Sequence, residues 1–510
     1  MLFLDPFIAR IIDNTLIYTV AVPLVDIALA IPLAVALKRT KKSWMLFLML
    51  LPSFIPYVTA AVAWALALNP FYGVTYYFLR TNLFVTVWFV VLVDVWESLP
   101  LATLVIYSGL KSIPSQIDEA TQVDGLVGMK RMLQVDLPYA LPYVLTSLVL
   151  MLIFAIFTFD PIYVTQGEVA PLANVDLAFY AYQQFFGGQP GYAAVLIVLM
   201  SVISTALSLA FVRFTTSRGV RRLPVPRWVP NRETPSAVHW AVLSFFLFFF
   251  LAPLAWLVLE SLKVPAAIYA IPPQIIPDPA TLVHYVNAVV SGLPYLLSSV
   301  VVAAGVLVLT VLLGSPAAYA MARYGFGGTK LLAYVLFVYS LPSLIFMIPL
   351  YGLVNFLGLI NTWWGQIVTF PVFVLPVVMW MMYNAYSNFP QHVDEAAQMD
   401  GLSRVRAFFR IVLPLSADGI GVAALYSFLI SWGALIFPLV LTYSPFNMNL
   451  AYPSGAQTFS IFIGGTLGHE SVHYGQLAAA AIISVLPPSL LLYFTRERLE
   501  RMWRSGGVKG

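Results

Sequence analysis

The polar residues with the clearest chemical pattern in this sequence occur in two copies, and every matching pair is separated by the same offset along the chain. In each copy a proline precedes a short amphipathic segment that carries acids in its first turn and ends at a glycine. Acids favour the start of a helix, and glycine readily adopts the left-handed turn that stops one. Carboxylates presented in this way can meet basic groups of a partner. The matching residues are Pro114, Asp118, Glu119, Ala120, Gln122, Asp124, Gly125, Leu126, Leu137 and Pro138, and Pro390, Asp394, Glu395, Ala396, Gln398, Asp400, Gly401, Leu402, Leu413 and Pro414.

Each copy is a polar island between apolar stretches. The small residues Ala120, Ala396 and Ala397 would let a short helix lie close in a groove of a partner. One alternative is a pair of interfacial helices that merely connect membrane spans. Interfacial solvation alone does not require the same spacing twice, so the repeat favours two equivalent docking points for a soluble partner.

The elements that must position these segments are membrane helices. The chain has 510 residues, of which 61% are hydrophobic and 9% charged, whereas a soluble domain carries about 25% charged residues. The composition therefore predicts an all-α polytopic membrane protein. The sequence has no cysteine, which excludes disulfides, thiol catalysis and cysteine metal sites.

A span needs about 20 apolar residues, and eleven stretches qualify. We expect a first half at residues 1–212 with five spans, a basic proline-rich linker at 213–237, and a second half at 238–510 with six spans. The expected spans are Ile11–Leu37, Trp44–Leu68, Leu83–Leu110, Leu141–Phe159, Tyr192–Val212, Val238–Leu259, Tyr295–Ala320, Leu331–Phe356, Trp364–Tyr383, Gly419–Leu441 and Tyr474–Phe494.

The basic residues predict the orientation. With eleven spans and a cytoplasmic C-terminus, 23 of the 26 Lys and Arg residues fall in cytoplasmic segments. The outer segments hold only Arg10, Arg80 and Lys263. This bias predicts an N-terminus outside and both polar islands inside.

Two other patterns could carry chemistry. His469-Glu470-Ser471-Val472-His473 matches the HExxH zinc pattern, but glycines flank it and no third ligand is evident, so we expect no metal site and no cofactor. Asp26, Asp94 and Glu97 fall inside expected spans, where a carboxylate costs about 3 kcal/mol. They can line a polar path or form hydrogen bonds between helices. The chain has no GxxxxGK[ST] loop that could hold ATP phosphates.

Both polar islands resemble the EAA loop of binding-protein-dependent ABC importer permeases, whose pattern is roughly EAAxxDGxxxxxxFxxxxLP. The first copy reads Glu119-Ala120-Thr121, Asp124-Gly125 and Leu137-Pro138, and the second reads Glu395-Ala396-Ala397, Asp400-Gly401 and Leu413-Pro414. Further stretches are similar to the carbohydrate-uptake, maltose-type branch. They include Asn69-Pro70, Asp160-Pro161-Ile162-Tyr163 and Ser261-Leu262-Lys263.

The resemblance implies that both EAA loops form coupling helices that seat on two separate ATPase subunits. ATP binding would then drive alternating access of a sugar path, and an outer solute-binding protein would deliver the sugar. This chain would be no enzyme itself. It would be a cell-membrane permease in which two normally separate subunits are fused. The family usually has six helices in each half, whereas the first half here shows five. It also often has Asn and an acid where this chain has Gly433-Ala434.

For the sugar path, the sequence points to Asp160, Tyr163 and Trp432. The two aromatic residues lie beside the helices that follow the coupling loops and could stack on sugar rings, or they could pack inside the protein. Three other functions stay open: an ion-gradient transporter that uses Asp26, Asp94 or Glu97, a membrane enzyme built around His469 and His473, and an ABC permease for ferric ion or polyamine.

Overall fold

The computed structural model describes residues 5–40, 43–77, 86–126, 128–156, 158–166, 174–217, 236–327, 343–387, 392–442, 455–466 and 473–505, with 331, 334–335, 338 and 341 between the longer ranges. These residues form helices joined by loops, and their one β-type pairing is an isolated bridge between Lys263 and Ala280. The predicted all-α class is confirmed.

Six helical segments of the described chain are long and apolar enough to cross a membrane. Proline interrupts several of them without ending the helix, as at Pro23 and Pro32. The segments are α1 (Ile8–Thr40), α4 (Val87–Lys111), Met132–Ala155, which comprises the π-helix η5 (Met132–Asp136) and α7 (Leu137–Ala155), α11 (Ala237–Leu262), α13 (Val283–Tyr324) and α24 (Tyr474–Ser505).

Three further pairs of helices could each form one bent span, so the described residues contain six to nine candidate spans and do not confirm eleven. The stretch expected at Trp44–Leu68 bends by 109°. Ile55 is extended there, with φ −88° and ψ 135°. Pro56 follows it, and the residue before a proline avoids helical geometry. The pieces are α2 (Ser43–Leu50), the 3-10 helix η2 (Leu51–Phe54) and α3 (Tyr57–Ala67).

The predicted single span Gly419–Leu441 is broken in the structure. α21 (Ala417–Gly433) ends before Ala434, whose backbone is extended with φ −64° and ψ 137°, and a new helix α22 (Ile436–Leu441) follows. The other two bent pairs join α16 (Trp363–Thr369) to α17 (Pro371–Ser387) at 43°, and Arg404–Leu415 to α21 at 80°.

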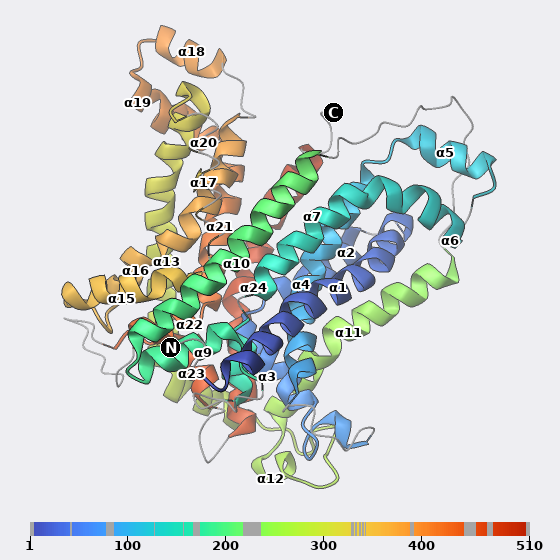
Figure 1. Cartoon of the computed structure of the whole chain (residues 1–510), viewed down its shortest axis with the longest axis vertical. Helices are drawn as coiled ribbons and strands as arrows, with labels where there is room; N and C mark the ends of the chain where they lie inside the picture. The colour runs from blue at the N-terminus through green and yellow to red at the C-terminus, as the bar shows by residue number, and fades with distance from the viewer. Residues whose placement is uncertain are drawn as a thin grey trace. The chain divides into compact units, whose positions relative to one another are not determined.

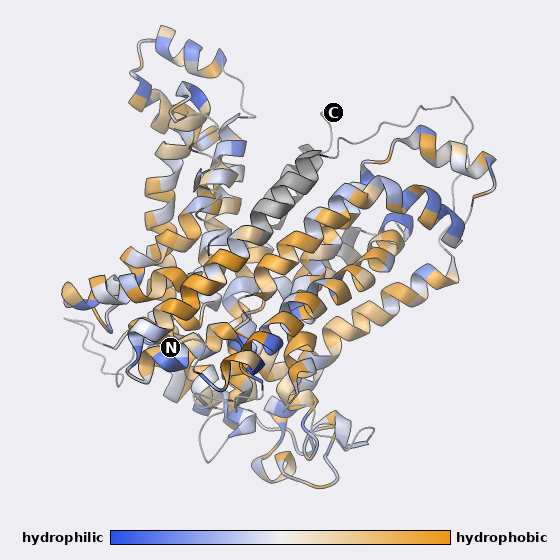
Figure 2. Cartoon of the chain, viewed as in Figure 1, coloured by the Kyte–Doolittle hydropathy of each residue, from blue (hydrophilic) through white to orange (hydrophobic). Residues whose placement is uncertain are grey.

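The chain forms two compact units, which are described separately. Unit 1 comprises Met1–Val286 and Gly465–Ile482. In it α1 packs against α4, α7 and α11, and α10 (Pro190–Ser217) packs against α7 and α9 (Leu177–Phe186) (Figure 1). Apolar residues run along these long helices (Figure 2). Its shorter elements are η3 (Val74–Tyr77), α5 (Ser115–Val123), α6 (Gly128–Arg131), α8 (Asp160–Gln166) and α12 (Pro265–Ile268).

The sequence halves and the compact units divide the chain differently. α11 belongs by sequence to the expected second half but packs against α1 and α3 in unit 1. The division at 1–212, 213–237 and 238–510 stays a prediction, and most of the linker, 218–235, lies outside the described residues.

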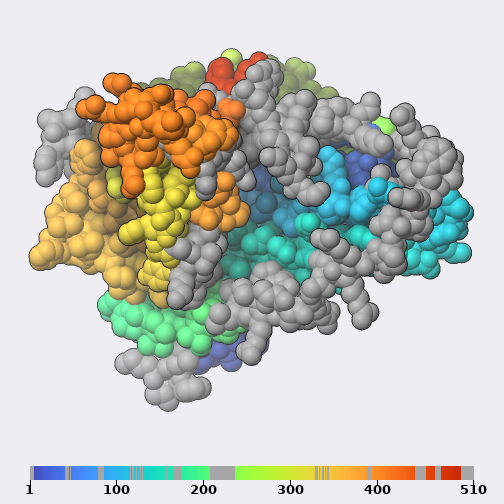
Figure 3. Space-filling model, turned by 90° about the horizontal axis from the view of Figure 1, so that it is seen from above, coloured from blue at the N-terminus to red at the C-terminus, as the bar shows by residue number. Residues whose placement is uncertain are grey.

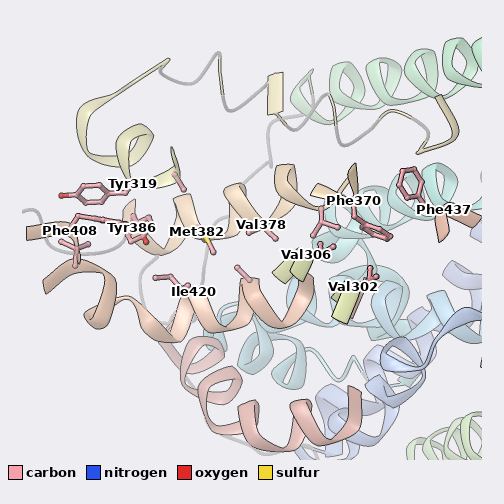
Figure 4. Packing of buried hydrophobic residues seen from close by; sticks show 14 of the residues in the cluster. Val302, Val306, Tyr319, Phe370, Val378, Met382, Tyr386, Phe408, Ile420 and Phe437 are labelled. Atoms are coloured by element: carbon pink, nitrogen blue, oxygen red, sulfur yellow. The ribbon is translucent and has the colours of Figure 1, made fainter. Parts of the chain in front are cut away.

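Unit 2 comprises Asn287–Gly464 and Ile483–Gly510. Its core forms where α17 packs against α21, and it includes Val378, Met382, Tyr386 and Ile420 (Figure 4). Thr310 on α13 is joined to Ser427 on α21 by a hydroxyl–hydroxyl bond of 2.8 Å. Its shorter elements are the 3-10 helix η6 (Ser343–Phe346), α15 (Met347–Phe356), α18 (His392–Met399), α19 (Arg404–Ala407), the π-helix η7 (Phe408–Val412), α20 (Leu413–Leu415) and α23 (Phe459–Thr466).

Candidate functional site

The first polar island forms α5, which ends in a left-handed turn at Gly125, with φ +67°. The Asp124 amide donates to the Ala120 carbonyl (3.0 Å) and the Leu126 amide donates to the Thr121 carbonyl (2.9 Å). The second bond reaches back five residues, as in a Schellman helix end, which needs a left-handed residue just before the donor. The predicted role of Gly125 as a helix stop is confirmed.

The second island forms the same structure at the same register. α18 ends at Gly401, with φ +81°. The Asp400 amide donates to Ala396 (3.0 Å) and the Leu402 amide donates to Ala397 (3.1 Å). A Cβ added at Gly125 or Gly401 would touch nothing within 4 Å, so backbone conformation and not space makes glycine the fitting residue.

A π-helix follows each turn, and the sequence did not predict it. η5 and η7 lie at equivalent positions of the two copies, and each covers five residues. The backbone amides of Leu137 and Leu413 close the two π-helices by donating hydrogen bonds to the carbonyls of Met132 and Phe408. Pro138 and Pro414, in the second position of α7 and α20, supply the reason, because a proline has no N–H to donate to the preceding turn.

The described side chains of these loops divide into an inner and an outer set. Thr121 and Ala397 are buried, so Ala397 packs within unit 2. Glu395, Ala396, Asp124 and Asp400 are exposed, and Ala120 is half-buried. Figure 3 shows the orange atoms of α18 and α19 uncovered at this end of unit 2. The side chains of Asp118, Glu119 and Asp394 lie outside the described part of the structure.

One large apolar side chain stands out on each helix. Val123 on α5 is 66% exposed and Met399 on α18 is 88% exposed, and the two residues occupy equivalent positions of the repeat. An apolar side chain repeated on the outer face of two polar helices is typical of a surface that a partner covers.

Two carboxylates inside the membrane segments of unit 1, Asp26 and Asp94, accept hydrogen bonds from neighbouring segments. Ser98 Oγ on α4 donates to Asp26 Oδ2 on α1 (2.6 Å). Thr158 Oγ1, just before α8, donates to Asp94 Oδ2 on α4 (2.7 Å). These bonds support the interpretation of Asp26 and Asp94 as links between segments.

Two of the three residues predicted for a sugar path, Tyr163 and Trp432, are enclosed by protein. Tyr163 is 3% exposed and lies among Phe159, Phe179 and Tyr182, with ring centroids 5.7, 6.4 and 6.2 Å away. Asp160 is the first residue of α8 and is half-buried.

Trp432 is 2% exposed in unit 2, stacks on Phe428 at 5.7 Å and donates from Nε1 to the Ser484 carbonyl (3.0 Å). The role of Asp160, Tyr163 and Trp432 in a sugar path stays a prediction.

In the zinc-like pattern, residues 469–472 lie outside the described part, and His473 is exposed. The described residues contain no group of three His, Cys, Asp or Glu side chains placed to hold a metal ion.

The sequence matches a known family in both halves. The family described as binding-protein-dependent transport system inner membrane component matches residues 9–218 and 310–505. The matches together cover most of the 510 residues.

Three similar proteins each align with about half of this chain over most of their own length. The diacetylchitobiose uptake system permease protein NgcG of Streptomyces coelicolor is 30% identical over 270 residues, which are 52% of this chain and 85% of that protein. The sulfoquinovosyl glycerol transport system permease protein SmoH of Agrobacterium fabrum is 29% identical over 264 residues, 51% of this chain and 89% of that protein. The trehalose transport system permease protein SugB of Mycobacterium tuberculosis is 30% identical over 278 residues, 54% of this chain and 98% of that protein.

Each relative thus corresponds to about half of this chain. Because the family matches in both halves and the same helix, turn and π-helix recur in both, this chain belongs to the binding-protein-dependent transport system inner membrane components, with two copies of the domain in one multi-pass membrane polypeptide.

Proposed function

We propose that this chain is the permease of an ABC importer that moves a sugar, a di- or oligosaccharide, into the cell, driven by ATPase subunits on separate chains. The substrate class rests on relatives whose names refer to diacetylchitobiose, sulfoquinovosyl glycerol and trehalose, all of which are glycosides. An outer solute-binding protein would supply the sugar.

The observation that carries this proposal is the matching geometry of the two loops. Each offers a short helix with a fixed end, at Gly125 or Gly401, and one exposed apolar side chain, Val123 or Met399. A short helix with a fixed end can transmit a rigid-body push from a partner. Two equivalent docking helices fit two equivalent ATPase subunits, with one subunit bound to each loop.

The proposed orientation places both loops in the cytoplasm and the N-terminus outside. In unit 1 the last turn of α1, with Lys38 and Arg39, contacts Asp136, the last residue of η5 at the end of the first loop. A basic helix end and the first loop therefore lie on the same side, as the positive-inside rule requires for a cytoplasmic loop. Movement of the loops would rock two related halves and open the sugar path alternately to the two sides.

Reconstitution tests the proposal. The chain is placed in proteoliposomes with its ATPase and solute-binding protein, and uptake of labelled disaccharide is measured with ATP, with a non-hydrolysable ATP analogue and after addition of an ionophore. We expect uptake only with hydrolysable ATP and ATPase, with no effect of the ionophore. Uptake that needs no ATPase and collapses with the ionophore would contradict the proposal.

A panel of binding-protein ligands in the same vesicles tests the substrate class. Disaccharides should be taken up, and the expected uptake of ferric ion or polyamine is at background level. Uptake of either of those solutes in place of sugars would overturn the sugar assignment while leaving the ABC permease intact.

A further inference from the structure

The two coupling loops are fastened to their own units by different kinds of interaction. The first loop ends in a buried charge cluster centred on Asp136, the last residue of η5. Asp136 is 2% exposed and contacts three cations: Arg39 at 3.2 Å, Lys38 at 3.5 Å and Arg131 at 3.5 Å. Removing one partner of a buried ion pair leaves an uncompensated buried charge, so such a cluster resists separation of its parts.

The cations of this cluster come from two elements. Arg131 is fully buried at the end of α6, within the loop itself. Lys38 and Arg39 are in the last turn of α1, 97 residues or more before Asp136 in the sequence. The cluster therefore joins the first loop to the end of α1.

α1 connects this cluster to the opposite end of unit 1. Near its start, Tyr18 Oη donates to the Asn174 carbonyl (2.8 Å) and Thr15 Oγ1 accepts from the Leu177 amide (2.9 Å). Thr15 and Arg39 are about 36 Å apart along a helix, at 1.5 Å per residue. A displacement of the first loop that moves the end of α1 would thus reach the segment that precedes α9.

At the two positions equivalent to Arg131 and Asp136, the second loop carries uncharged residues. By the offset that relates Gly125 to Gly401, Arg131 and Asp136 correspond to Ala407 and Val412, which are 1% and 0% exposed. Phe408, the first residue of η7, packs instead against Tyr319 of α13 and Tyr386 of α17, with centroids 4.7 and 6.2 Å away (Figure 4). The hydroxyls of Ser315 on α13 and Tyr386 on α17 are 2.5 Å apart and join these two helices.

We propose that Asp136 is a positioning residue that couples the first loop to α1 through charge, whereas aromatic packing couples the second loop to α13 and α17. The inference rests on the proposed function, because it concerns how ATPase movement reaches the membrane helices. It predicts that the two loops, although alike on their outer faces, differ in their dependence on one carboxylate.

The test is Asp136→Asn in the reconstituted importer, with sugar transported per ATP hydrolysed as the readout. Asparagine keeps the shape and removes the charge. We expect the transport ratio to fall about tenfold, with ATPase binding and hydrolysis retained. Asp13→Asn, an exposed position on α1, is the matched control and should keep the wild-type ratio. An unchanged transport ratio in Asp136→Asn would overturn the proposal. A fall in the ratio that only matches the loss of assembled complex would overturn it too.

Two further variants keep the proposal testable if Asp136→Asn does not fold. Arg39→Gln leaves Asp136 paired with Lys38 and Arg131, and should lower the ratio about threefold; an unchanged ratio would overturn the proposal.

Because the chain has no cysteine, Arg39→Cys combined with Asp136→Cys can be bridged by a short bifunctional methanethiosulfonate. Bridging should restore coupling and a reductant should abolish it again, whereas a merely structural cluster would give no such reversal. Failure of the wild-type complex to use ATP would refute the proposed function, and that result is distinct from every outcome above.

Discussion

Gly125 and Gly401 occupy the same left-handed backbone conformation at equivalent positions of the two copies, with φ of +67° and +81°. Open space surrounds both Cβ positions. The conformation of the turn, and with it the direction in which each short helix points, is therefore what glycine provides.

Valine at both positions should uncouple hydrolysis from transport. A β-branched residue in the left-handed region costs about 1–2 kcal/mol or more, so each turn would reorganise. The double variant Gly125→Val/Gly401→Val should assemble in the membrane and lose most transport per ATP in the vesicle assay. Gly352→Val is the control, since Gly352 is an exposed helical glycine with free space and no positive φ. Normal transport by the double variant would refute the role of the two turns.

Carboxylates that act as links between segments should tolerate the loss of their charge. Asp26→Asn and Asp94→Asn keep a carbonyl oxygen that can accept from Ser98 and Thr158. We expect ATP-driven uptake within about twofold of wild type, because each hydrogen bond is preserved. Loss of uptake in either variant, together with ionophore sensitivity of the wild type, would favour the ion-gradient transporter.

The pair Glu260 and Lys263 should contribute strongly to the stability of unit 1. Lys263 is fully buried, bonds to the Glu260 carboxylate and lies 4.5 Å from the Trp256 ring centroid. Lys263→Met leaves a buried carboxylate alone, and breaking such a pair costs about 3–5 kcal/mol. Thermal unfolding in detergent should show a large fall in Tm. The double variant Glu260→Gln/Lys263→Met should regain part of it, and a double variant less stable than Lys263→Met would contradict this reasoning.

Asp5, ahead of α1, should make unit 1 sensitive to acid. Partial burial raises the pKa of its carboxyl, but hydrogen bonds from Tyr180 Oη (2.6 Å), Tyr192 Oη (2.7 Å) and the Phe7 amide outweigh that effect and hold the pKa below its usual 3.8. A lowered pKa in the folded state stabilises the protein above the usual value, and the stabilisation is lost as the pH falls through the lowered one. The Tm difference between wild type and Asp5→Asn should therefore be constant near neutrality and shrink below about pH 4. A difference that grows towards acid pH would refute the sign.

The sequence was sufficient for the class of fold and for the loop turns, because the pattern of apolar runs and the two glycines are local signals. Pro138 and Pro414 stand out in the repeated pattern. The π-helices before them depend on which carbonyls of two successive turns accept the amide hydrogen bonds, and the residue pattern does not reveal this. The break at Ala434 was hidden within a continuously apolar stretch. The partners of Asp26 and Asp136 lie on other helices, Ser98 for the first and Arg39 for the second, so only the packed structure identifies them. Lys263 lies in an expected outer segment, and the structure buries it beside Glu260.

Cross-linking at the two exposed apolar residues tests most directly whether α5 and α18 are the helices that bind the ATPase subunits. Val123→Cys and Met399→Cys are made singly in the naturally cysteine-free chain and treated with a membrane-impermeant thiol reagent from each side, then with a cross-linker in the presence of the ATPase. Both residues should react only from the cytoplasmic side, and each should cross-link to an ATPase subunit. Reaction of the two residues from opposite sides of the membrane, or absence of a cross-link at both, would contradict the proposal.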